Sequence, residues 1–246
     1  MIYFETFSVP TADTLFLLIL SILALESAHS IQFLYQHFLS RITEKSPNVF
    51  YYACSYAKVD YSRFMNTTVR IALKLIPDSL QTQPVFLCVD DTMVSKFGTK
   101  FENVSKLFDH AAHNGSNYLN GHCFVSVMLC VPVWNGDKVY YLSVPLGYRM
   151  WQKKESKLKL AASMIRQVMP EFHSKDHVII LCDSWYTKQN PVSIVDEYPN
   201  LDLIGSARID SVMYDLAPAR TGRQGRPAKH GKRLSVETEF TFSNEK

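Results

Sequence analysis

Two short apolar runs, each followed by aspartate, are the strongest indication of the fold of this chain. Val85-Phe86-Leu87-Cys88-Val89 precedes Asp90-Asp91-Thr92, and His177-Val178-Ile179-Ile180-Leu181-Cys182 precedes Asp183. Unbroken apolar runs of this length are typical of parallel strands that are buried on both faces. Between them, Glu155–Met169 is predicted to be an amphipathic helix, because one face carries Leu158, Ala161, Ala162, Ile165, Val168 and Met169. Since parallel strands need a crossover connection, we expect these two strands to be neighbours in one sheet.

The segments around this unit complete an α/β pattern. Cys123–Val133 and Lys138–Pro145 flank Asn135-Gly136-Asp137, and Asn-Gly between apolar runs predicts a hairpin. Residues 92–121 are rich in Gly, Asn and His and are expected to form a loop. Further along, the pattern predicts a helix over 187–197, disturbed near its start by a proline, and a short strand over 201–205.

The two ends of the chain have different patterns of apolar residues. Apolar positions recur at helical spacing through Leu15–Leu25 and again from Phe64 to Leu75, so the first eighty residues are expected to be helical. Leu15–Leu25 is shorter than the roughly 20 residues that cross a bilayer, and no Lys or Arg precedes it. We therefore expect a buried helix there, and no membrane or export segment. Residues 234–242 alternate between apolar and polar, as in a half-buried strand.

Composition limits the class of protein. The 246 residues are 47% hydrophobic and 20% charged, which predicts a globular protein of one large or two small domains. The formal charge of +3 is too small to identify a polyanionic partner. The five cysteines form no Cys-x-x-Cys motif, which favours a reducing cytoplasm over a disulfide framework or structural zinc.

The aspartates that follow the two buried strands are the candidate catalytic residues. Asp91 and Asp183 are expected side by side at the carboxyl ends of neighbouring strands, where their mutual repulsion favours a cation between them. Oxygen ligands suit Mg²⁺ or Mn²⁺, which can promote phosphoryl transfer. Asp90 is the alternative first ligand, because strand alternation points it and Asp91 to opposite faces and the register is open. Aspartate after a strand is also a common turn or cap residue.

Several motifs resemble those of the DDE transposases of bacterial insertion sequences, in the group with a β-rich insertion. The resemblance spans roughly residues 60–246 and rests on Val89-Asp90-Asp91-Thr92, Leu181-Cys182-Asp183-Ser184, Ile204-Gly205-Ser206-Ala207-Arg208 and Gly222-Arg223-Gln224-Gly225-Arg226-Pro227. It implies an RNase H-like mixed sheet with flanking helices. It also implies that Asp91 and Asp183 are the first two of three catalytic, metal-binding acids.

The third acid of that family is not identifiable. The expected pattern is Tyr, two residues, Arg, three residues, Glu, six residues, Lys, and none of the 13 tyrosines has Arg three positions later. Glu237 and Glu239 are poor substitutes, because they lie on a strand pattern and the third acid should come from a helix. We therefore expect a truncated polypeptide that is inactive by itself.

The resemblance divides the chain into three parts. Residues 1–80 would form a helical DNA-binding region, residues 81–210 the RNase H-like catalytic core with the first two acids, and residues 211–246 a basic loop and the start of the β-rich insertion. Between Arg220 and Arg233 the basic loop has no acidic residue, which suits contact with DNA phosphates, although a charge run can also be only solvated. Its cationic residues are Arg220, Arg223, Arg226, Lys229, Lys232 and Arg233. The lysines at 153–159 are more typical of a solvated helix face than of a DNA contact.

The leading functional hypothesis is a DNA transposase fragment. When complete, it would bind the inverted-repeat ends of a transposon and use Mg²⁺ or Mn²⁺ to cleave those ends and transfer them to target DNA. It would act as a homodimer on DNA. Its location would be the bacterial cytoplasm, in association with the nucleoid. One alternative is a non-catalytic DNA-binding remnant that inhibits an intact enzyme. Another is a free-standing RNase H-like nuclease.

Overall fold

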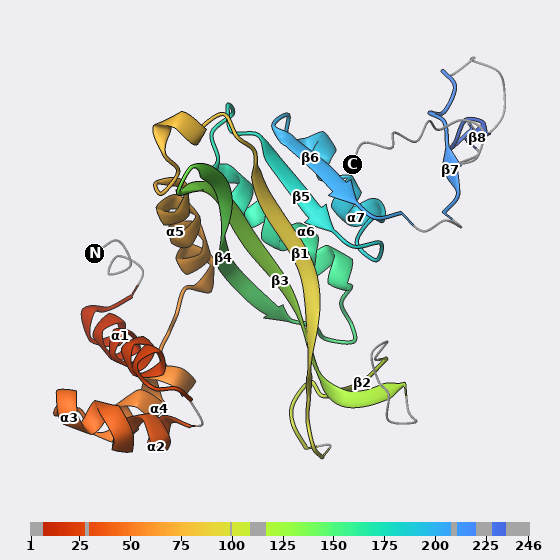
Figure 1. Ribbon diagram of the computed structural model, residues 1–246. Helices are drawn as coiled ribbons and strands as arrows, with labels where there is room; N and C mark the ends of the chain where they lie inside the picture. Colours follow the sequence, from red (N-terminus) through yellow and green to blue (C-terminus); the bar gives the residue numbers. More distant parts are fainter. Residues whose placement is uncertain are drawn as a thin grey trace.

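The protein is built around one mixed sheet (Figure 1). The structure, a computed structural model, describes residues 7–27, 30–98, 100–108, 117–207, 211–219 and 228–234. The six strands of the sheet are β1 (Val85–Ser95), β2 (Ser105–Phe108), β3 (Tyr118–Asn135), β4 (Lys138–Met150), β5 (Val178–Cys182) and β6 (Leu201–Gly205). The order is β2-β3-β1-β5-β6, with β4 also paired to β3.

Strand directions confirm the predicted fold class. β3 is antiparallel to both β1 and β4, whereas β5 is parallel to β1 and β6 is parallel to β5. The core is therefore an antiparallel meander extended by two parallel strands, which is the mixed sheet of the RNase H-like fold. The two apolar runs that were expected to be neighbours pair directly, with Val85 opposite Val178 and Val89 opposite Cys182.

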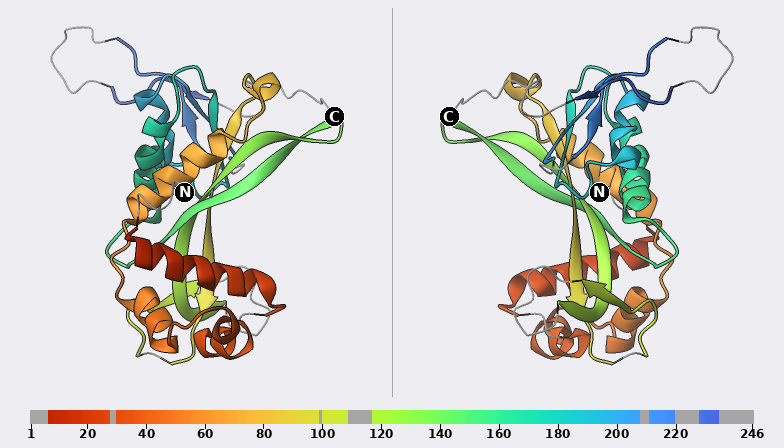
Figure 2. Two further views of the ribbon diagram at one scale, coloured as in Figure 1. Left: turned by 90° about the vertical axis from the view of Figure 1, so that its left-hand side faces the viewer. Right: turned by 90° about the vertical axis from the view of Figure 1, so that its right-hand side faces the viewer.

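Two helices cover one face of this sheet. They are α5 (Tyr61–Leu73) and α6 (Lys157–Val168), and Figure 2 shows both on the same side of the strands. The predicted apolar face of α6 packs inward, and its Ile165 has no exposed surface. Leu87, Val125 and Ile180 from three strands are equally buried and belong to the same core. Burial of this apolar surface is the main force that holds α6 on the sheet.

The sheet extends further than the sequence predicts. β1 does not end before Asp90 but continues to Ser95, which lies opposite Gly121 of β3. Residues 92–121 are accordingly not a simple loop, since β2 lies within them and β3 begins at Tyr118. Pairing with β3 satisfies the backbone groups of β1 and outweighs the turn preference of Asp-Asp-Thr.

The predicted hairpin is confirmed. β3 and β4 meet at a two-residue turn in which Gly136 has φ of +60°, a backbone conformation that glycine adopts without steric cost. After β5, the predicted helix over 187–197 is replaced by two short pieces, α7 (Gln189–Val192) and the 3₁₀ helix η5 (Val195–Glu197). Pro191 lies inside α7, and a proline cannot donate the hydrogen bond that would continue a longer helix.

The N-terminal region is helical, as predicted. It comprises α1 (Val9–Ala24), α2 (Ile31–Leu34), the π-helix η2 (Tyr35–Leu39), α3 (Ser40–Ile42) and α4 (Pro47–Ser55). These helices pack around their own small core of Leu18, Leu34, Leu39 and Phe50, away from the sheet (Figure 1). Among the described helices, none is long and apolar enough to cross a membrane.

Short elements complete the described chain. The 3₁₀ helices η3 (Asp78–Leu80) and η4 (Met169–Glu171) precede β1 and β5, respectively. Beyond β6, β7 (Met213–Tyr214) and β8 (Arg233–Leu234) form a small antiparallel pair. Apart from Leu234, the alternating segment 234–242 lies outside the described residues, as do Glu237 and Glu239.

Candidate active site at the carboxyl ends of β1 and β5

Asp91 lies on the helix-covered face of the sheet. It is in phase with Leu87 and Val89, so its side chain points toward α6 and is only 19% exposed. Its Oδ2 atom accepts hydrogen bonds from Nζ of Lys157 at 2.5 Å and from Sγ of Cys123 at 3.1 Å. Its Oδ1 atom lies 3.4 Å from the hydroxyl of Tyr186. Asp91 is therefore an ion-paired, largely enclosed carboxylate.

Lys157 comes from the first turn of α6. Its ammonium group also lies 5.7 Å from the centre of the Trp151 ring. Burial lowers the pKa of Lys157, but the hydrogen bond and the negative charge of Asp91 raise it by more, so the pKa is above its ordinary value. Lys157 therefore stays charged at neutral pH.

Asp90 and Asp183 have a different environment from that of Asp91. Asp90 points to the opposite face of β1 and is exposed, with Oδ1 accepting the backbone N–H of Asp91 at 2.7 Å. Asp183 is exposed directly after β5. Because Val89 pairs with Cys182 in the parallel ladder, Asp90 and Asp183 are the next residues at the same level of the two strands.

A turn fixes Asp183 beside the sheet. Its Oδ1 atom accepts the backbone N–H groups of Trp185 at 3.0 Å and Tyr186 at 3.3 Å, which is the pattern of an Asx turn. The turn directs Tyr186 into the core, where it has no exposed surface, and leaves Trp185 exposed. Nζ of Lys188 lies 3.9 Å from the centre of the Trp185 ring.

All three carboxylates influence one buried side chain, Tyr186. Burial raises the pKa of Tyr186, and the negative charges of Asp91, Asp90 and Asp183 raise it further. Of the three, Asp91 alone has a described contact with the Tyr186 hydroxyl, at 3.4 Å, whereas Asp90 lies on the other face of β1 and Asp183 in the turn after β5. Sequence analysis did not identify Tyr186, Cys123 or Lys157 as part of this site.

Lys157 corrects one expectation. The lysines at 153–159 were expected to lie on a solvated helix face, but Lys157 is an ion-pair partner of Asp91. A signal was present in the sequence, because a lysine at the first position of a helix opposes the helix dipole and needs a compensating partner. The partner itself is 66 residues away and follows only from the tertiary fold.

The basic segment is only partly described. Arg220, Arg223 and Arg226 lie outside the described residues, whereas Lys229, Lys232 and Arg233 lie at or near β8. The carbonyl of Lys232 accepts the N–H of Asp215 at 2.8 Å, and the rings of His230 and Tyr214 stack at 4.8 Å. The end of this segment is therefore anchored on β7.

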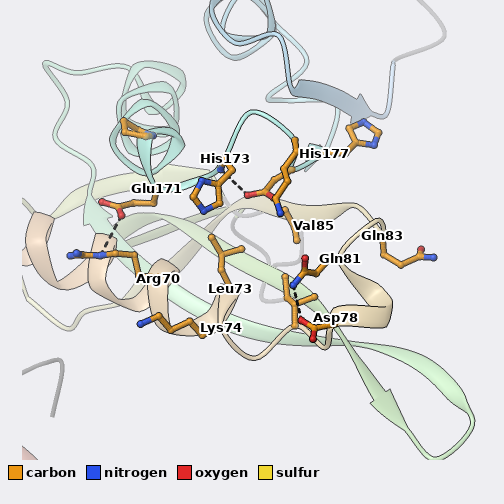
Figure 3. A pocket seen from close by; sticks show the side chains of 14 residues that line it. Arg70, Leu73, Lys74, Asp78, Gln81, Gln83, Val85, Glu171, His173 and His177 are labelled. Atoms are coloured by element: carbon orange, nitrogen blue, oxygen red, sulfur yellow. Dashed lines mark hydrogen bonds and ion pairs between the residues drawn. The ribbon is translucent and has the colours of Figure 1, made fainter.

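A cavity of about 640 Å³ lies at the other end of the sheet, beside Val85 and His177 where β1 and β5 begin (Figure 3). Arg70 and Glu171 form an ion pair at one edge of it, at 3.3 Å. Its charged lining is balanced, with Arg70, Lys74 and Lys175 against Asp78, Glu171 and Asp176. The cavity therefore has no net attraction for a polyanion and is remote from the candidate acids.

The donor set at the acids fits one kind of metal. Among the described residues, no three His, Cys, Asp or Glu side chains are close enough together to bind an ion. Two exposed carboxylates suit Mg²⁺ or Mn²⁺, because these ions take oxygen ligands and retain several waters. The residues present therefore fit such an ion with part of its shell left open for water and phosphate.

A comparison with protein-family models identifies the family of this chain. A family model for the DDE superfamily endonucleases matches residues 12–245, while no curated protein matches the chain. Among solved structures, the chain is similar to Mos1 transposase in a paired-end complex with the left transposon end, at 13% identity and a TM-score of 0.27. A Mos1 strand transfer complex matches at 14% identity and a TM-score of 0.25. Each match covers 80% of this chain but only 58% of the other.

Proposed function

The chain belongs to the DDE superfamily endonucleases, and we propose that it is a DNA transposase of the insertion-sequence type. It would bind transposon ends and, with a divalent metal, cleave and transfer DNA strands. The observation that carries the proposal is the pair of exposed carboxylates, Asp90 and Asp183, at the same level of two parallel strands.

Of the two candidates for the first metal ligand, Asp90 has the stronger support. Asp91, which sequence analysis favours, has both carboxylate oxygens directed at protein groups and is paired with Lys157. Asp90 is exposed, and only its Oδ1 atom accepts a hydrogen bond among the described residues. Asp183 likewise uses Oδ1 for the turn, which leaves Oδ2 for a metal.

Each part of the site then has a task. When bound, Mg²⁺ or Mn²⁺ would activate a water or a 3′-hydroxyl and stabilise the leaving oxygen of a phosphodiester. Asp90 and Asp183 would hold the ion, and the Asx turn would keep Asp183 at the end of β5. Lys157 keeps Asp91 neutralised beneath them.

DNA would be held by positive charge outside the sheet. The six Lys and Arg residues between positions 220 and 233 would contact the phosphates of double-stranded DNA, both transposon ends and target. The helical region at residues 1–80 would assist in binding the ends. Two copies of the chain would act together on paired ends.

Cleavage of DNA by the purified chain tests the proposal. A labelled DNA duplex is incubated with Mn²⁺ and one of three proteins, which are the wild-type chain, Asp183→Asn and Asp196→Asn. Asp196 is an exposed residue outside the site, so Asp196→Asn is the control. Metal-dependent nicking that only Asp183→Asn abolishes supports the proposal, and it would contradict the expectation, drawn from the unidentified third acid, that the chain is inactive by itself. DNA binding without nicking would favour a non-catalytic DNA-binding protein, and nicking without preference for transposon ends would favour a general nuclease. Nicking that survives in Asp183→Asn contradicts the site.

A further inference from the structure

We propose that Lys157 is a built-in cation of the metal site, which neutralises Asp91 and limits the affinity of the site for a divalent ion. The inference rests on the proposed function, because it concerns the same cluster of carboxylates. It assigns Lys157 the role of a positioning residue that acts through Asp91 and does not contact DNA or metal.

The Lys157–Asp91 ion pair is shielded from water more than the other described ion pairs. The two side chains are 22% and 19% exposed, compared with 43% and 41% for Arg166 and Glu197. Exposed pairs contribute little because water and salt screen them. A half-buried pair is screened less, so Lys157 should influence the charge of its surroundings strongly.

The position of Lys157 on its helix also indicates a tertiary role. It is the first residue of α6, a helix of 12 residues whose N-terminal end carries partial positive charge. A lysine there is unfavourable unless an anion lies nearby. Asp91 supplies that anion, and its contact with Cys123 at 3.1 Å holds the carboxylate toward the helix.

The charge of the cluster then matches one divalent ion. Asp90, Asp91 and Asp183 together carry three negative charges, and Lys157 reduces the net charge to minus two. Without Lys157, the cluster would keep an unmatched negative charge and attract a divalent ion more strongly. The metal-free protein would also be less stable, because Asp91 would be half-buried without a partner.

A double-mutant cycle tests this role. Mn²⁺ binding to each of four proteins is measured from the electron paramagnetic resonance signal of free Mn²⁺. They are the wild-type chain, Lys157→Met, Asp91→Asn and the double variant. We expect Lys157→Met to bind Mn²⁺ about tenfold more tightly and Asp91→Asn about tenfold more weakly. The double variant should bind like the wild type, because the opposite charges are removed together.

Lys159→Met is the matched control. Lys159 lies on the same helix and is exposed, so its loss should change Mn²⁺ affinity by less than about twofold. Thermal unfolding gives a second readout, in which Mn²⁺ should raise the Tm of Lys157→Met more than that of the wild type. A role confined to packing would lower the Tm equally with and without Mn²⁺.

The outcomes separate this inference from the proposed function. Equal Mn²⁺ affinities of Lys157→Met and Lys159→Met would overturn the role of Lys157 while leaving the metal site in place. Loss of Mn²⁺ binding in both Asp91→Asn and the double variant would also overturn it, because Asp91 would then be a ligand. A wild-type chain that binds no Mn²⁺ would overturn the proposed function together with the inference.

Discussion

The ammonium group of Lys157 lies 2.5 Å from Oδ2 of Asp91, and this ion pair joins the first turn of α6 to the middle of β1. Because side chains alternate along a strand, the preceding residue, Asp90, points to the other face and is exposed. Two consecutive aspartates therefore have different environments. In our account Asp91 is structural, whereas Asp90 binds metal.

The packing of α6 on the sheet should account for much of the stability. Ile165 has no exposed surface, so Ile165→Ala removes buried apolar atoms and leaves a cavity. We expect a loss of about 2–5 kcal/mol in the free energy of unfolding, measured by urea denaturation. Lys159→Ala on the exposed side of the helix should change it by less than about 0.5 kcal/mol. A similar small loss for Ile165→Ala would mean that α6 does not pack as described.

The close approach of β1 and β3 should make Gly121 intolerant of a side chain. A Cβ atom there would lie 2.3 Å from the carbonyl oxygen of Val94, so Gly121→Ala must shift backbone. We expect it to destabilise the protein by about 1–3 kcal/mol in the same urea experiment. Gly147→Ala is the control, because its Cβ would meet nothing nearer than Sδ of Met65 at 3.8 Å. Equal stability of the two variants would contradict the pairing of β1 with β3.

The cysteines should react at very different rates. Burial, with the hydrogen bond to Asp91, raises the pKa of Cys123 to about 11, and burial beside Cys130 raises that of Cys88 to about 12. A raised pKa keeps a thiol protonated, so only about one Cys123 in a thousand is a thiolate at pH 8. Iodoacetamide should therefore label the exposed Cys54 long before Cys123 or Cys88, as followed by mass spectrometry.

Two further observations check the cysteine prediction. Labelling of Cys123 should rise about tenfold for each pH unit between 8 and 10, because the thiolate fraction rises by that factor. In guanidinium chloride all five cysteines should react, since unfolding removes the protection. Rapid labelling of Cys123 in the folded protein would contradict the environment described for Asp91.

DNA affinity should depend on salt through the basic segment. Each phosphate contact contributes about 0.9 to the slope of log affinity against log salt concentration. Lys229→Gln combined with Lys232→Gln should therefore reduce the steepness of that slope by about 2, as measured by fluorescence anisotropy with a labelled duplex. Lys138→Gln combined with Lys175→Gln is a control with the same loss of charge, at exposed lysines outside residues 1–80 and outside the basic segment. Equal slopes for the two double variants would place the DNA on another surface.

Local sequence patterns predicted most of the core. The apolar runs before Asp90 and Asp183 form neighbouring parallel strands, and the helical spacing within Glu155–Met169 corresponds to α6. The Asn-Gly signal corresponds to the turn at Gly136. These features depend on residues close in sequence, so they can be predicted without knowledge of the tertiary structure.

Other features depend on partners that are distant in sequence. The extension of β1 to Ser95 requires β3, whose pairing residues lie about 30 positions later. The environment of Asp91 is set by Lys157, 66 residues away, and by Tyr186, 95 residues away. Alternation predicted that Asp90 and Asp91 face opposite sides, but only the tertiary structure tells which side has the helix.

Mn²⁺ binding to Asp90→Asn and to Asp91→Asn, measured by electron paramagnetic resonance, shows which of the two aspartates is the metal ligand. Our account predicts that Asp90→Asn, like Asp183→Asn, shows no saturable binding where the wild type is saturated. Asp91→Asn should still saturate, at higher Mn²⁺ concentration, because it loses nearby negative charge but no ligand. Wild-type binding by Asp90→Asn, with binding lost in Asp91→Asn, would contradict the account and make Asp91 the metal ligand.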